Sequence, residues 1–287
     1  MTGKRSGQPL PVAQDMAAPT PSPELLTGPA LHTAVRQGRL REVEKLLAEG
    51  ADIEEKVEDP FNETALHVCC HRSTTTDQVQ VLMVQLLVAH NADVSAKNFY
   101  RNTPLHSAAC RQDHEVVAKA LLDLGADVAT TNALGRTPLH CAVMYGDEAM
   151  ATLLLTAGAD LSAKDIGGIG VRGGIGGMTP LHLALHGDTM HVNMVKMVEL
   201  LLAKGADVSA RNNLGETPKE DATRRSLQVT GDSHRRLLHQ IAAMIEAEEV
   251  RRAKCMAFAM GLGGRLGVDS CVNVLDEGVL RLVLEHV

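Results

Sequence analysis

Apolar residues recur along this chain at the spacing of amphipathic helices, and residues 137–165 show the pattern most clearly. One apolar stripe with i, i+3, i+4 spacing is interrupted at Gly146 and Asp147, and a second stripe follows. The first stripe consists of Leu139, Ala142 and Val143, and the second of Met150, Leu153, Leu154 and Leu155. This pattern predicts two short helices, each with one buried side.

Both predicted helices have recognisable ends. Thr137 is a good N-cap, and Pro138 suits the first helical position, where the missing N–H has no intrahelical partner to lose. Gly158 ends the second helix in the manner of a left-handed C-cap. The residues that follow, up to Asp165, are expected to leave as an extended arm.

The same unit recurs along most of the chain. Its start is a Thr-Pro-Leu-His motif or a close variant, and its end is a Gly-Ala-Asp or Asn-Ala-Asp motif. Each start lies 34 to 42 residues after the previous one. The starts begin at Pro29, Thr64, Thr103, Thr137 and Thr179, with a degenerate sixth at Thr217, and the ends begin at Gly50, Asn91, Gly125, Gly158 and Gly205.

With these two motifs recurring in register, the chain resembles the ankyrin-repeat family over about residues 29–248. The resemblance implies an all-α ankyrin-repeat solenoid of helix-turn-helix repeats with β-hairpin arms. We expect a disordered, Pro-rich N-terminal tail over residues 1–28, the solenoid over residues 29–249 and a C-terminal helical extension over residues 250–287. The polar repeat that starts at Thr217 is expected to cap the solenoid.

Composition and charge indicate the kind of core, the class of partner and the cellular location. The chain is 45% hydrophobic but only 2% aromatic and has no Trp, so the core must be aliphatic. A net charge of −7 argues against nucleic acid as the partner. The first residues lack the apolar segment of a signal peptide, and no apolar run is long enough to cross a membrane. Six cysteines without metal-type spacing indicate reduced, packed thiols in a cytoplasmic or nuclear protein.

Histidines are the main candidates for chemistry, and their positions favour a structural role. They occupy one position in each repeat and would form a ladder along the solenoid. The resemblance implies that each bonds to backbone and to the neighbouring Thr. These residues are His32, His67, His106, His140 and His182.

Two other patterns suggest ligands. His182, His186 and His191 lie near Asp188 and could bind a metal ion, but no further Cys or carboxylate completes the site. Residues 168–173 fit G-x-G-x-x-G, but they lie between an exit arm and a helix start rather than in a βαβ unit, which favours a flexible loop. No nucleophile–base motif is present, so we expect no catalysis, no metal and no cofactor.

The positive signal for function is the location of aromatic and arginine residues. Phe61 lies in the first arm, Phe99 and Tyr100 lie at the tip of the second, and Tyr145 ends the first helix of the fourth repeat. Arg101, Arg136 and Arg211 occupy comparable tip positions. These side-chain types dominate interface energetics. We therefore expect a monomeric scaffold that binds a partner protein through its concave surface and arm tips, unless Phe61 and Phe99 fold back over their own arms.

The C-terminal segment suggests an alternative. Residues 275–287 resemble the opening helix of an F-box, although Asp276 stands where that motif usually has Pro. On this reading the protein would be an adaptor whose tail recruits an effector such as a ubiquitin ligase. Packing of the same apolar helix on the last repeat is the competing interpretation.

Overall fold

The structure, a computed structural model, describes residues 30–57, 60–72, 75–167, 175–186, 191–228 and 232–259. Within these ranges the chain forms twelve α-helices and no β-strand. The first helices of the repeats are α1 (Ala30–Arg36), α3 (Ala65–Arg72), α5 (Pro104–Ala109), α7 (Pro138–Tyr145), α9 (Pro180–Ala184) and α11 (Pro218–Gln228). The second helices are α2 (Leu40–Ala48), α4 (Asp77–Ala89), α6 (Glu115–Asp123), α8 (Glu148–Thr156) and α10 (His191–Ala203), and the last helix is α12 (Asp232–Ala259).

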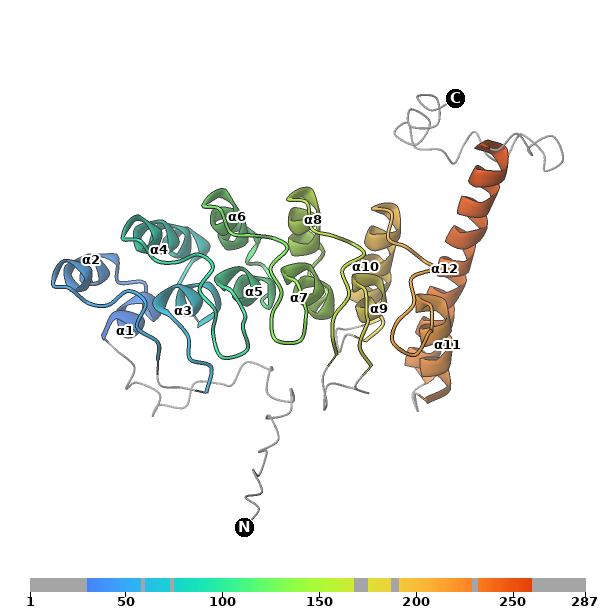
Figure 1. Ribbon diagram of the computed structural model, residues 1–287, viewed down its shortest axis with the longest axis horizontal. Coiled ribbons are helices and arrows are strands. Elements are labelled where there is room, and N and C mark those ends of the chain that lie inside the picture. Colours follow the sequence, from blue (N-terminus) through green and yellow to red (C-terminus); the bar gives the residue numbers. More distant parts are fainter. Residues whose placement is uncertain are drawn as a thin grey trace, which may run out of the picture.

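The helices form two rows (Figure 1). Helices α1, α3, α5, α7, α9 and α11 pack in order along one row, and α4, α6, α8, α10 and α12 pack in order along the other. The arms that connect the repeats project on the side of the first row. This arrangement confirms the all-α solenoid that the repeated motifs predict.

The core lies between the two rows and is aliphatic, as composition requires. Leu105 and Leu121 of one repeat and Leu139 and Leu154 of the next are completely buried. Each such side chain contributes about 1.5–3 kcal/mol when it leaves water. No aromatic side chain that the structure describes is fully buried.

The Thr-Pro-Leu-His motifs act through both nitrogens of the imidazole. In α7 the Thr137 N–H donates to Nδ1 of His140 (3.1 Å). The proton is therefore on Nε2, which faces the carbonyls of Ala163 (3.1 Å) and Met178 (3.3 Å) in the next arm. One ring thus links the start of a helix to the following repeat. Nε2 of each other motif histidine faces one backbone carbonyl of the next arm: His32 with Glu63, His67 with Asn102, His106 with Arg136, and His182 with Glu216.

Four of these histidines, His67, His106, His140 and His182, are neutral at pH 7 because burial lowers their pKa. Burial lowers the pKa of His67, His106 and His140 to about 4. It also lowers the pKa of His182. A protonated Nδ1 would place a donor against the Thr N–H, so the neutral ring is the form that the bonds require.

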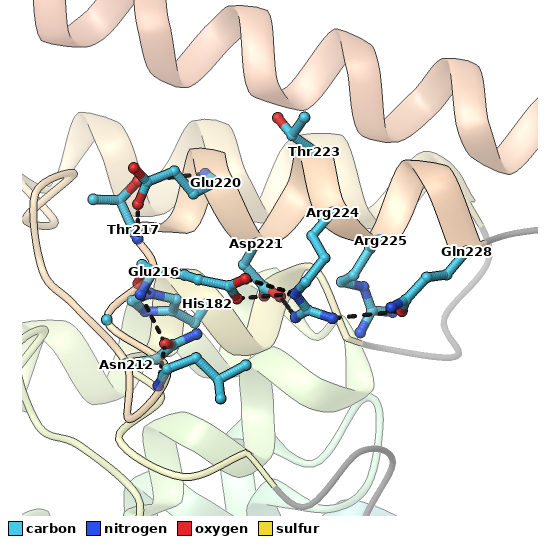
Figure 2. Close-up of polar contacts among 12 residues, drawn as sticks. His182, Asn212, Glu216, Thr217, Glu220, Asp221, Thr223, Arg224, Arg225 and Gln228 are labelled. Carbon is cyan, nitrogen blue, oxygen red and sulfur yellow. Dashed lines mark hydrogen bonds and ion pairs between the residues drawn. The ribbon is translucent and has the colours of Figure 1, made fainter.

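The row of histidines ends at α11, where Glu220 stands at the equivalent position (Figure 2). The Thr217 N–H donates to Oε2 of Glu220 (2.7 Å), and the Glu220 N–H donates to the Thr217 hydroxyl (3.3 Å). This is a reciprocal capping box. A carboxylate has no N–H to donate to a following arm. Glu220 therefore caps the start of α11 without linking this helix to another repeat.

Helix α12 covers the last repeat. Leu238, Ile241 and Ile245 are buried, and α12 packs on α10 and α11. Arg252 donates to the carbonyls of Leu202 (3.5 Å) and Ala206 (2.9 Å) at the end of α10.

One of the two expected domain boundaries falls within the described residues. The boundary between residues 249 and 250 falls inside α12, which continues to Ala259. The tail 1–28, for which we expected disorder, and residues 275–287, for which we expected a helix, lie outside the described residues.

Candidate protein-binding surface

The second to fifth arms each close over an Asn or Asp side chain, whereas the first arm has Val57 at the equivalent position. In the second arm, Oδ1 of Asn98 accepts the N–H groups of Tyr100 and Asn102 (3.0 Å each), and the Asn98 N–H donates to the Asn102 carbonyl (3.0 Å). Such local bonds favour a turn over a strand. The arms are hairpin turns, and their described residues contain no β-strand. Asn132, Asp165 and Asn212 close the later arms with similar bonds.

Neighbouring arms are hydrogen-bonded to one another near their tips. The Phe99 N–H donates to the Phe61 carbonyl (2.8 Å), and the Ala133 N–H donates to the Tyr100 carbonyl (2.9 Å). Further along, the N–H of Ile166 donates to the carbonyl of Leu134 (2.8 Å) and that of Asn213 to the carbonyl of Gly176 (2.9 Å). The arms therefore form one connected row.

Three of the predicted aromatic anchors meet in one cluster on the first two arms. The rings of Phe99 and Tyr100 are perpendicular, with centroids 5.3 Å apart. Phe61 packs across the arms against Tyr100, with centroids 5.9 Å apart. Phe61 and Tyr100 are half-buried, and Phe99 remains 53% exposed. Phe61 thus contacts the neighbouring arm instead of covering only its own.

Arg101 and Arg211 lie on exposed parts of the arms, as predicted. Arg101 has a φ of 59° at a turn position where the third and fifth arms have Gly135 and Gly215. The guanidinium of Arg211 donates to the Gly215 carbonyl and lies 3.4 Å from Glu220.

Tyr145 is the last residue of α7 and lies in a later repeat than the aromatic cluster, of which it is not a member. Its side chain is half-buried, and burial raises the pKa of its phenol. Its carbonyl accepts the side-chain amide of Gln112 (3.1 Å), which connects the ends of two neighbouring first helices.

Arg136 does not lie at an exposed tip, so our expectation for this residue was wrong. It is buried, and its Nε lies 3.3 Å from Oδ2 of Asp165 in the next arm. Asp165 is itself buried and accepts the Met178 N–H through its other oxygen (2.9 Å). Arg136 therefore holds two arms together and is not available to a partner.

Two exposed residues on the same row were missed by the sequence analysis. Ile166 is 71% exposed and Leu214 is 58% exposed. Both follow the Asn or Asp that closes their arm, by one and two positions, as Phe99 and Tyr100 do. Their fixed distance from that polar residue is a sequence signal for them, but they are aliphatic and so are not part of a pattern of aromatic and arginine residues.

The other candidate ligand sites find no support in the described residues. No group of three or more His, Cys, Asp or Glu side chains there is arranged to hold a metal ion. His186, one of the proposed ligands, is hydrogen-bonded through Nε2 to Asp221 (2.7 Å) and through Nδ1 to Arg225. The glycine motif at 168–173 and Asp188 lie outside the described residues.

His186 belongs to a buried polar network that attaches α11 to α9. Asp221 is fully buried and contacts both His186 and Arg224, and Arg224 also pairs with Glu216 (2.8 Å). Figure 2 shows Asp221 and Arg224 pointing toward one another below α12. Burial raises the pKa of Asp221, but His186 and Arg224 lower it more, so its pKa is below the usual range. The network therefore stabilises the last repeat by holding α11 against the end of α9.

No helix in the part of the chain that the structure describes has the length and apolar character needed to cross a membrane. The cysteines described there form no disulfide, and Cys69, Cys70 and Cys141 are buried, as predicted for packed thiols.

Comparison with known proteins agrees with the architecture. Residues 31–132 and 77–165 match a family model described as ankyrin repeats in three copies, and residues 176–213 match a single ankyrin repeat. A protein of fowlpox virus (strain NVSL), named as an ankyrin repeat protein, is 29% identical over 177 residues. The matched region is 62% of this chain but only 36% of the viral protein. From its repeats, its fold and these matches, the chain belongs to the ankyrin-repeat family.

Proposed function

We propose that this protein is a non-catalytic scaffold that binds a partner protein through its arm tips and the adjoining surface of the first helices. Ankyrin repeats are generally protein–protein interaction domains and typically have no catalytic role. The observation that carries the proposal is the aromatic cluster of Phe61, Phe99 and Tyr100. The protein keeps aromatic side chains out of its described core and places these three on connected arms.

The arms suit this role because they are already ordered. Hydrogen bonds within and between arms fix the cluster, so binding orders few additional groups. Truncation of a central aromatic anchor is expected to cost about 2 kcal/mol, or roughly 30-fold in affinity. Arg101, Arg211 and Tyr145 are proposed as further contacts.

The test is quantitative affinity capture from the source cell with the full chain as bait. Phe99→Ala combined with Tyr100→Ala should reduce the captured partner at least tenfold. The matched control is Leu82→Ala combined with Val116→Ala, which removes exposed apolar side chains from α4 and α6. Circular dichroism would check that both variants fold. Equal capture by the wild-type chain and the tip variant would refute the proposal.

The adaptor alternative rests on residues 275–287, which lie outside the described residues. No structural observation favours it, and it stays a hypothesis from the sequence.

A further inference from the structure

Cys110 and Cys141 bring together two thiols from neighbouring repeats. Cys110 directly follows α5, and Cys141 lies in the first half of α7. These two helices pack against each other, and the side-chain amide of Gln112 donates to the Tyr145 carbonyl (3.1 Å). Gln112 stands two positions after Cys110, and Tyr145 stands one helical turn after Cys141. That bond therefore holds both cysteines at the same part of the interface between the third and fourth repeats.

The two thiols are hydrogen-bonded to each other, with Cys110 as the donor. This bond raises the pKa of Cys110 and lowers the pKa of Cys141. Burial opposes ionisation of both sulfurs, whereas the nearby Arg136 guanidinium favours it. Cys141 is therefore the thiol that ionises more readily, and the thiolate is the form of cysteine that reacts with oxidants.

A small oxidant can reach this pair from the side of Cys110, which is half-buried, whereas Cys141 is 5% exposed. The other described cysteines have different surroundings. Cys69 and Cys70 are buried neighbours in α3, and burial raises the pKa of both thiols. Cys255 is half-buried in α12, in another part of the solenoid. Among these five thiols, Cys110 and Cys141 are the pair whose contact joins two repeats.

We propose that Cys110 and Cys141 form a disulfide when the protein meets a peroxide, and that this bridge covalently joins the third and fourth repeats. The Cys141 thiolate attacks one oxygen of hydrogen peroxide, the O–O bond breaks, and the released hydroxide becomes water with the proton that Cys141 gave up. The Cys110 sulfur then attacks the sulfenic acid at Cys141. An S–S bond forms and the second oxygen leaves as water with the Cys110 proton, so two thiols lose two electrons to one peroxide.

Such a bridge suits the interface in which the thiols lie. Because the two sulfurs are already in contact, rotation of the side chains can bring them to the separation of about 2 Å that a disulfide needs. The cysteines are 31 residues apart, so the bridge restricts a substantial loop of the unfolded chain and stabilises the folded one. It also fixes α7, which carries Tyr145, against α5.

The test is peptide mapping of the full chain after treatment with hydrogen peroxide, with free thiols alkylated under denaturing conditions before digestion with trypsin. Trypsin releases Cys110 within residues 102–111 and Cys141 within residues 137–164, and each peptide contains one cysteine. We expect the two peptides to be linked, with the loss of two hydrogens, and to separate in dithiothreitol. Peroxide should also raise the midpoint of thermal unfolding by about 5–10 °C, and dithiothreitol should reverse the rise.

Two variants make the test specific. Cys110→Ser keeps the size of the side chain and should remove both the linked peptide and the rise in the midpoint. The matched control, Cys255→Ser, changes a half-buried cysteine of α12 and should keep both. Recovery of Cys110 and Cys141 in separate alkylated or overoxidised peptides would overturn the inference. A link from either residue to a different cysteine, or a bridge that leaves the midpoint unchanged or lowers it, would overturn it as well.

Discussion

Acidification should destabilise this protein through its buried histidines. In the native state the pKa of His67, His106 and His140 is about 4, against 6.5 for an unburied imidazole. Between these values the unfolded chain binds protons that the folded chain does not, so stability must fall as the pH falls. From pH 7 to pH 5 the loss is about 2 kcal/mol for each histidine, or about 5–6 kcal/mol for the three. That is comparable to the whole stability of many domains.

Urea unfolding followed by far-UV circular dichroism at both pH values measures this loss. His106→Gln removes one of the three groups, so this variant should lose about 2 kcal/mol less than the wild-type chain between pH 7 and pH 5. The matched control is His90→Gln, which removes an exposed histidine outside the row. Equal stability at the two pH values, or an unchanged pH dependence in His106→Gln, would refute the argument.

Three further predictions concern packing and ion pairs. Asp165→Ala leaves the buried Arg136 without its partner and should cost about 3–5 kcal/mol, measured by urea unfolding; a cost below 1 kcal/mol would contradict the pairing. Phe99→Ala should change stability by no more than about 0.5 kcal/mol, whereas Leu105→Ala at a fully buried site should cost about 2–5 kcal/mol, both by thermal unfolding. Arg252→Ala removes two bonds from α12 to the end of α10 and should speed hydrogen exchange in α12, with α5 as the internal reference.

Local signals predicted the repeats well because they act over a few residues. Thr137 and Pro138 start α7, and Gly158 follows α8 with a φ of 92°, as their backbone preferences require. The apolar stripes identified most of the buried side chains, since helical periodicity is a local property. In the two stripes of residues 137–165, Leu153 and Leu155 are half-buried and the other members are buried.

Long-range contacts explain what the sequence did not reveal. The partner of Arg136 lies 29 residues away, so its position in the repeat suggested an exposed tip while the fold buries it. The boundary near residue 250 was placed where the repeat motif ends and stays a prediction, and the motif carries no information about the contacts of α12. This helix is held by Leu238, Ile241 and Ile245 against earlier helices.

The closure of the fourth arm makes it a natural site for grafting foreign sequence. Asp165 and Met178 are joined by two hydrogen bonds although they lie 13 residues apart, whereas Asn98 and Asn102 make similar contacts at a separation of four. The base of an arm therefore closes independently of the length of chain above it, and loop-closure entropy grows only slowly with that length. An epitope or a small domain inserted between residues 167 and 175 should leave the stacked helices undisturbed and be displayed beside the arm tips.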